Sequence, residues 1–137
     1  MSCFPRPQEA SFVVNKTRPV NLDLGTISLP VTAKASILHR VSGVFLVAAV
    51  AVLLYALDLS LSGEAGFARA VDMLGSPMAR LIIWVVLAGL IYHAVAGAKH
   101  LLMDLGVGET LEGGIKGARI TFAVSGILIA AAGVWVW

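Results

Sequence analysis

Charged side chains are scarce in this sequence of 137 residues: they make up 13% of it, whereas a soluble domain carries about a quarter. Hydrophobic residues make up 58%, and so few charges cannot cover the surface of a soluble globular protein. The net charge of +2 is too small, and the basic residues are too dispersed, for a nucleic-acid-binding surface. We therefore expect a membrane protein that binds lipid and no nucleic acid.

Several catalytic and metal-binding patterns are also missing. The single cysteine, Cys3, excludes a disulfide framework and a cysteine metal site. The glycine-rich stretch GVGETLEGG lacks the preceding strand and the GK[ST] ending of a phosphate-binding loop. There is no HExxH, no nucleophile elbow and no pair of carboxylates inside an apolar run. We expect no hydrolytic catalysis by this chain alone.

What the chain does have is three long apolar runs, at roughly residues 41–61, 81–105 and 120–137. Each is close to the ~20 residues with which a helix crosses a bilayer core of ~30 Å. No run contains a proline, so nothing interrupts the backbone hydrogen bonds that a helix must make in lipid. We predict an all-α membrane protein with three transmembrane helices, at roughly residues 32–61, 77–105 and 117–137.

The segments outside the runs indicate the layout of the chain. Residues 1–31 are rich in proline and are expected to form an extended cytoplasmic arm, followed by a membrane anchor over residues 32–137. In the first connection Phe67, Ala70, Val71 and Leu74 recur at helical spacing, which is enough for an interfacial turn or two. Ser76 and Pro77 have the pattern of a helix cap and first helical residue.

The charge distribution predicts how the chain sits in the membrane. Basic residues flank the start of the first run and the second connection, so the N-terminus is expected inside and the C-terminus outside. The polar stretch before the first run argues against a cleavable signal peptide, and no basic, serine-rich presequence opens the chain. We expect a bacterial cytoplasmic membrane rather than the mitochondrial inner membrane.

Two histidines lie on one face of the second transmembrane segment. His93 is ~22 Å along the helix from its start, and His100 follows with Gly97 between them on the same stripe. Ionisable side chains within membrane segments are rare and usually functional. A neutral imidazole is a good axial ligand for haem iron, and a neighbouring glycine leaves room for a flat macrocycle. The alternative is an imidazole that is hydrogen-bonded to a neighbouring helix.

A second polar group stands at the start of the first segment. Ser36 and Arg40 share one helix face, and His39 lies on the adjoining face. A hydroxyl beside a guanidinium can donate hydrogen bonds to a quinone carbonyl, and the positive charge favours the anion formed on reduction. His39 could meet a haem propionate or relay a proton. Alternatively, Arg40 and His39 anchor the helix at the interface and Ser36 starts it.

The second segment ends in further charged residues. Lys99 and His100 lie close to the cytoplasmic end of the segment. Their side chains could contact a haem propionate, or they could simply extend to the membrane interface. Asp104 follows one turn later and could pair with them.

These stretches together, RPVNLDL, PVTAKASILHRVSG and HAVAGAKHLLMD, resemble the cytochrome b556 subunits of succinate dehydrogenase, the larger membrane anchors of respiratory complex II. The motifs SxxHRxSG and HxxxGxxHLxxD carry the resemblance, which covers the chain from about Arg18 to its C-terminus. It implies a helical bundle with a second anchor subunit, and one haem b held between the two with a histidine ligand from each. It also implies docking to an iron–sulfur subunit, and through that to a flavoprotein subunit.

By this resemblance His93 is the haem iron ligand, and His39 and Arg40 lie near the propionates, with Gly97 and His100 on the haem side of their helix. Ser36 and Arg40 belong to the ubiquinone site. Further apolar walls of that site are Leu24, Leu29 and Ile37.

The resemblance implies electron transfer from succinate, through flavin and iron–sulfur clusters in other chains, to ubiquinone at this subunit. Two other functions stay open: a purely structural anchor, and a quinol-oxidising fumarate reductase anchor of the same architecture. A transporter or channel is less favoured, because no segment has a continuous polar stripe or a break in its middle.

Overall fold

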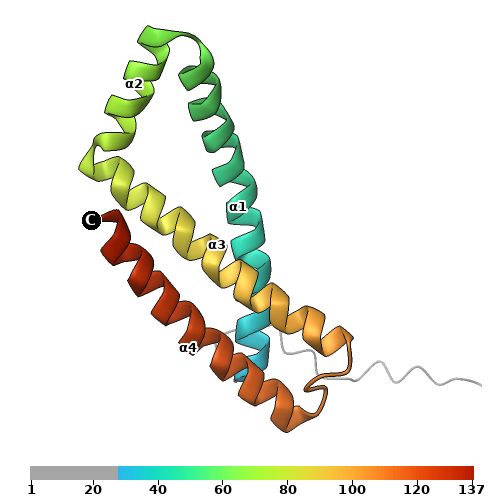
Figure 1. Ribbon diagram of the computed structural model, residues 1–137. Coiled ribbons are helices and arrows are strands. Elements are labelled where there is room, and N and C mark those ends of the chain that lie inside the picture. Colours follow the sequence, from blue (N-terminus) through green and yellow to red (C-terminus); the bar gives the residue numbers. More distant parts are fainter. Residues whose placement is uncertain (1–27) are drawn as a thin grey trace, which may run out of the picture.

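The computed structural model describes residues 28–137, and all the regular structure in that range is helical (Figure 1). The helices are α1 (Val31–Leu61), α2 (Glu64–Gly75), α3 (Pro77–Asp104) and α4 (Leu111–Val136). Helices α1, α3 and α4 are long and apolar enough to cross a membrane. The predicted fold class, an all-α membrane protein with three transmembrane helices, is therefore confirmed. Cys3, Arg18, Leu24 and nearly all of the expected cytoplasmic arm lie outside the described range.

Local sequence determines where the helices begin. Helix α1 starts directly after Pro30, which has an extended backbone conformation. At α3 the Ser76 hydroxyl accepts a hydrogen bond from the Ala79 N–H at 3.2 Å, and Pro77 is the first helical residue, as predicted. Helix α4 begins at Leu111 rather than near residue 117, because the Thr110 hydroxyl caps it by accepting from the Gly113 N–H at 3.1 Å.

The connection between α1 and α3 is more ordered than expected, since α2 is a helix of 12 residues instead of a turn or two. It follows Gly63, whose φ of +114° lies in the region that favours glycine. Gly66 and Ala70 are buried, whereas Phe67 and Val71 are exposed. This distribution is typical of a helix that lies at a membrane interface with its apolar side chains toward lipid.

The transmembrane helices pack through small side chains. Helices α3 and α4 run antiparallel beside each other, and α1 crosses α3 (Figure 1). Buried small residues form the contact stripes; they are Ala35, Ser42 and Ala49 on α1 and Gly114, Ala118, Thr121 and Ser125 on α4. Small residues let backbones approach closely where lipid provides no hydrophobic driving force. Most large apolar side chains consequently face outward, away from the rest of the described chain.

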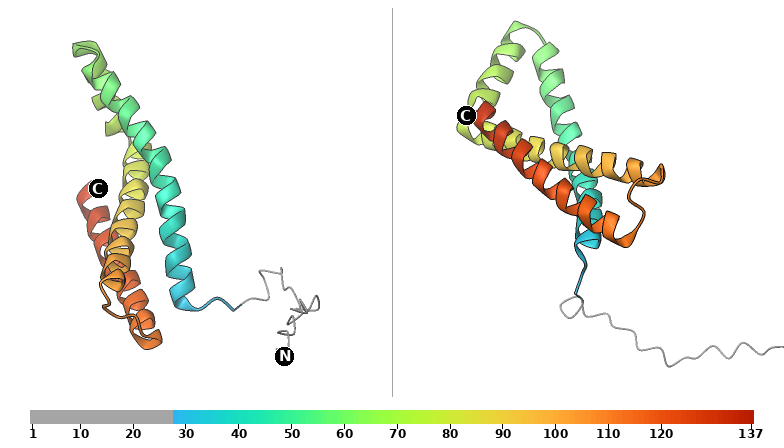
Figure 2. Two further views of the ribbon diagram at one scale, coloured as in Figure 1. Left: turned by 90° about the vertical axis from the view of Figure 1, so that its right-hand side faces the viewer. Right: turned by 60° about the horizontal axis from the view of Figure 1, so that its bottom comes forward.

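The start of α1 and the connection between α3 and α4 lie at the same end of the molecule, and α2 lies at the other end (Figure 2). The directions of α1, α3 and α4 thus alternate along the chain, as three successive membrane crossings require. The polar residues near the start of α1 and those near the end of α3 are brought to one end of the molecule by this arrangement.

Candidate functional site

The three histidines meet where α1 crosses α3. The imidazole of His39, from α1, stacks on that of His93, from α3, with ring centroids 4.2 Å apart and planes at 21°. The ring of His100 lies 5.2 Å from that of His39, tilted by 42°. His39 therefore sits between the two histidines that the sequence placed on one face of α3.

Each histidine of the stacked pair faces a glycine on the other helix. A Cβ on Gly43 would lie 3.1 Å from Cε1 of His93, and a Cβ on Gly97 would lie 3.4 Å from Nε2 of His39. The glycines leave the space that the rings occupy, so α1 and α3 approach closely at this level. Gly97 thus provides room for an imidazole of this chain, where the sequence had suggested room for a macrocycle.

The protonation of His93 follows from its hydrogen bonds. Its Nδ1 lies 3.1 Å from the Ser42 hydroxyl and 3.2 Å from the main-chain carbonyl oxygen of His39. The Ser42 hydroxyl itself donates to that same carbonyl at 2.7 Å. Because a carbonyl oxygen only accepts, Nδ1 must carry the proton in the neutral ring. The lone pair is then on Nε2, which is the nitrogen available to a metal.

His39 has a buried nitrogen that lacks a partner. Among residues 28–137 nothing forms a hydrogen bond with its Nε2, although the atom is buried. Leaving such an atom unsatisfied costs ~1–3 kcal/mol. A ligand or a partner subunit that supplied a hydrogen-bonding group here would remove that cost and so bind more tightly. A carboxylate, such as a haem propionate, is one group of that kind.

The residues predicted to bind quinone lie on the outer side of α1. Ser36 is half-buried, whereas Ile37 and Arg40 are exposed. Arg40 borders a shallow hollow of about 410 Å³ together with Val41, Val44 and Phe45. This face of α1 is left open by the described part of the chain. Leu29, just before α1, is also exposed.

Tyr92 stabilises the turn of α1 that carries Ser36. Its hydroxyl donates a hydrogen bond to the main-chain carbonyl of Ala35 at 2.9 Å, and its ring stacks on Phe122 of α4 with centroids 5.8 Å apart. Neither Tyr92 nor Ser42 is among the site residues predicted from the sequence. A signal for each was present, since Ser42 is part of the SxxHRxSG motif and Tyr92 directly precedes His93.

The polar residues near the end of α3 differ in their exposure. Lys99 and His100 are half-buried, and Asp104, the last residue of the helix, is exposed. Within residues 28–137 no group of three His, Cys, Asp or Glu side chains could surround a metal ion. A metal bound at His93 would therefore have few further ligands from the described residues.

Comparison with known proteins shows which family and which relatives this chain is similar to. The sequence profile of the succinate dehydrogenase/fumarate reductase transmembrane subunit family matches residues 14–132. The chain is 37% identical over 125 residues to the succinate dehydrogenase cytochrome b556 subunit of Coxiella burnetii, covering 90% of this chain and 100% of the relative. It is 31% identical over 111 residues to the subunit of the same name from Paracoccus denitrificans, covering 81% and 85% of the two chains.

Proposed function

The chain belongs to the succinate dehydrogenase/fumarate reductase transmembrane subunit family, and we propose that it is a cytochrome b anchor that holds haem b and forms part of a ubiquinone-reducing site. The observation that carries the proposal is the pair of hydrogen-bond acceptors at Nδ1 of His93, which leave Nε2 free for iron. The names of both relatives, cytochrome b556 subunits, support a b-type haem.

The residues around His93 fit a haem. Ser42 and the His39 carbonyl orient the ring, and the unsatisfied Nε2 of His39 is suited to a propionate. His100, next to His39, and the Arg40 guanidinium add positive or hydrogen-bonding groups for the same carboxylates. Gly97 contributes by admitting the His39 ring. The haem would supply reversible one-electron transfer, and a second anchor subunit would contribute a further ligand to its iron.

The ubiquinone site uses the outer face of α1. Ser36 donates a hydrogen bond to one quinone carbonyl, and the charge of Arg40 stabilises the negative charge that builds up on the oxygen during reduction. Ile37 and Leu29, both exposed, offer apolar walls. Leu24, outside the described residues, is proposed as a third apolar wall. An iron–sulfur subunit, itself attached to a flavoprotein subunit, closes this face and delivers the electrons from succinate.

The setting that we propose is the bacterial cytoplasmic membrane, with the N-terminus in the cytoplasm and the C-terminus in the periplasm. It places the start of α1 and the end of α3 on the side where a soluble succinate-oxidising domain docks.

The haem assignment is tested on the purified complex by its reduced-minus-oxidised spectrum. We expect a b-type band that His93→Ala abolishes. His100→Ala, two turns away on α3, should retain the band, because His100 is proposed to reach a propionate and not the iron. A band of unchanged size in His93→Ala would show that the ligand is elsewhere. A complex that assembles and never contains haem would instead favour the purely structural anchor.

The quinone assignment is tested with two electron acceptors. Arg40→Leu removes a charge-assisted hydrogen bond of ~1.5–3 kcal/mol, so we expect quinone reduction to fall by roughly 10- to 100-fold. Ser36→Ala should cause a smaller loss. Succinate oxidation with an artificial acceptor should persist in both variants. The control is Arg80→Leu, at the opposite end of the molecule, in which quinone reduction and succinate oxidation with the artificial acceptor should both persist. Equal losses in the two assays would contradict the assignment.

The family includes fumarate reductases, which run the reaction in reverse. Rates of quinone reduction by succinate and of quinol oxidation by fumarate, measured on the same preparation, decide between these directions.

A further inference from the structure

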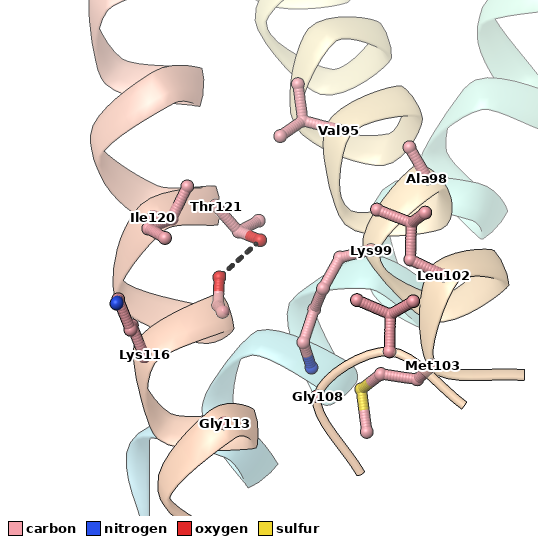
Figure 3. Close-up of a pocket in the computed structure, with 12 residues that line it drawn as sticks. Val95, Ala98, Lys99, Leu102, Met103, Gly108, Gly113, Lys116, Ile120 and Thr121 are labelled. Atoms are coloured by element: carbon pink, nitrogen blue, oxygen red, sulfur yellow. Dashed lines mark hydrogen bonds between the residues drawn. The ribbon is translucent and has the colours of Figure 1, made fainter. Parts of the chain in front are cut away.

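A groove lies between α3 and α4, on the side of α3 that faces away from α1 (Figure 3). Its volume is about 430 Å³, which is within the ~300–1,000 Å³ range of ligand sites. Its walls are Val95, Ala98, Leu102, Met103, Ile120 and Thr121, with three glycines and Val107 near the connection. The Thr121 hydroxyl is occupied, because it donates to the Gly117 carbonyl at 2.9 Å. The interior of the groove is accordingly apolar.

Two lysines border this apolar groove, one from each helix. The Lys99 side chain extends across α4, where its Cε lies 3.4 Å from the position of a Cβ on Gly117, and its ammonium points toward the connection (Figure 3). Lys116 stands on the opposite wall. Within residues 28–137 no carboxylate forms an ion pair with either lysine. Two positive charges thus border the groove without a counterion from the described chain.

The lysines are placed at the depth of lipid headgroups. Each is five residues from the end of its helix nearest the connection, or roughly 8 Å at the rise of an α-helix. Lysine side chains are long enough to carry their charge over that distance to the interface, with the stem against apolar surface. The apolar part of the groove continues from there toward the middle of the helices, through Ala98 and Val95.

We propose that this groove binds one anionic phospholipid. The phosphate would lie beside the ammonium of Lys99, and the long Lys116 side chain, whose ammonium is turned away from Lys99 in Figure 3, would swing toward it from the opposite wall. An acyl chain would follow Ala98, Val95 and Ile120. Basic pockets between transmembrane helices are suited to anionic headgroups, and the apolar walls are suited to a chain. A free phosphate would leave the walls exposed, and an ordinary apolar helix of another subunit would leave both charges unpaired. The site is separate from the histidine cluster, which is on the α1 side of α3.

The proposal is tested by counting lipid on the intact complex. The complex is reconstituted in nanodiscs of phosphatidylcholine containing a small share of phosphatidylglycerol, and native mass spectrometry measures how much phosphatidylglycerol stays bound. In the double variant Lys99→Gln/Lys116→Gln we expect an affinity about 30-fold lower, since each interfacial cation contributes about fivefold. The control is Lys34→Gln/Arg119→Gln, which removes two exposed cations at the same end of the molecule, outside the groove.

A second variant tests the apolar part of the groove without changing charge. Ala98→Trp places a large ring in the groove, so it should also displace phosphatidylglycerol, while the subunit composition in the same spectra reports on assembly. A soluble headgroup, glycerophosphoglycerol, should not compete.

Three results would overturn the proposal. The first is equal loss of lipid from the control and the groove variant, which indicates general surface charge. The second is competition by the soluble headgroup, or no loss in any variant. The third is an Ala98→Trp complex that loses a subunit and keeps its lipid, which indicates that a protein helix occupies the groove. Because haem absorbance is recorded separately, failure here and failure of the haem assignment are distinguishable.

Discussion

Replacing Ser42 by alanine tests whether α1 controls the haem ligand on α3. The hydroxyl of Ser42 is one of two acceptors for the proton on Nδ1 of His93, at 3.1 Å, and the other is the His39 carbonyl at 3.2 Å. Ser42→Ala removes the first acceptor and keeps the second. The ring should keep its tautomer and lose part of its orientation, so His93 should still bind iron, less tightly.

The size of the effect follows from one lost hydrogen bond. A neutral hydrogen bond contributes ~1 kcal/mol net, and loss of a group that orients a metal ligand typically costs ~10- to 100-fold in affinity. Because one acceptor remains, we expect the lower end of that range, a haem affinity about 10-fold weaker. The missing oxygen leaves a space smaller than a methyl group, so the loss of packing is minor.

The measurement is a haem titration of complex prepared without haem, with the b-type spectrum as readout. Ser60→Ala is the matched control. The Ser60 hydroxyl donates to the Leu57 carbonyl at 2.8 Å, a hydrogen bond to the residue three positions earlier like the one that Ser42 makes. Ser60 is half-buried and lies near the other end of α1. Its removal should leave haem affinity unchanged. If the two variants behave alike, or if Ser42→Ala binds haem as tightly as the parent, Ser42 does not orient His93.

Three further changes have effects that the structure specifies. Gly97→Val should displace the imidazole of His39 and reduce haem retention, because even a Cβ at position 97 would lie 3.4 Å from Nε2 of that ring. Gly126→Val is the control, since a Cβ at position 126 has nothing within 4 Å, and it should retain haem fully. Tyr92→Phe should raise the KM for quinone severalfold, because it removes the ~1 kcal/mol hydrogen bond to the Ala35 carbonyl, and an unchanged KM would show that this contact does not position the site. Thr110→Ala should lower the Tm of the complex through loss of a helix cap of ~1 kcal/mol, with the haem spectrum unaffected; an unaltered Tm would argue against the cap.

The helices were predictable where their signals are local. The absence of proline from the apolar runs and the Ser76 cap with Pro77 depend on neighbouring residues only, and the start of α3 was predicted correctly. The start of α4 was predicted too late, near residue 117, which left Gly113 and Gly114 out of the helix. In the structure Gly114 is buried, and a Cβ there would lie 3.7 Å from Thr32 of α1. That contact between distant parts of the chain has no local signature.

The site was predictable as a set of residues and not as an arrangement. Helical spacing placed His93, Gly97 and His100 on one face, but the ring that lies against this face belongs to His39 on another helix. The role of Ser42 was missed for a similar reason. Serine hydroxyls in helices ordinarily bond to a carbonyl of their own helix, as in α1 elsewhere, and only the crossing of α3 gives Ser42 a second partner.

A repeated spacing in the two helices nevertheless accounts for the crossing. His39 and Gly43 on α1 are four residues apart, as are His93 and Gly97 on α3. Because the two helices run in opposite directions along the molecule, each histidine meets the glycine of the other helix. This pairing occupies Nδ1 and Cε1 of the His93 ring from the α1 side, so Nε2 is the atom left for a ligand. A haem on that atom needs its remaining surface covered by protein outside the described residues, which is why we expect the chain to retain haem firmly only within its complex.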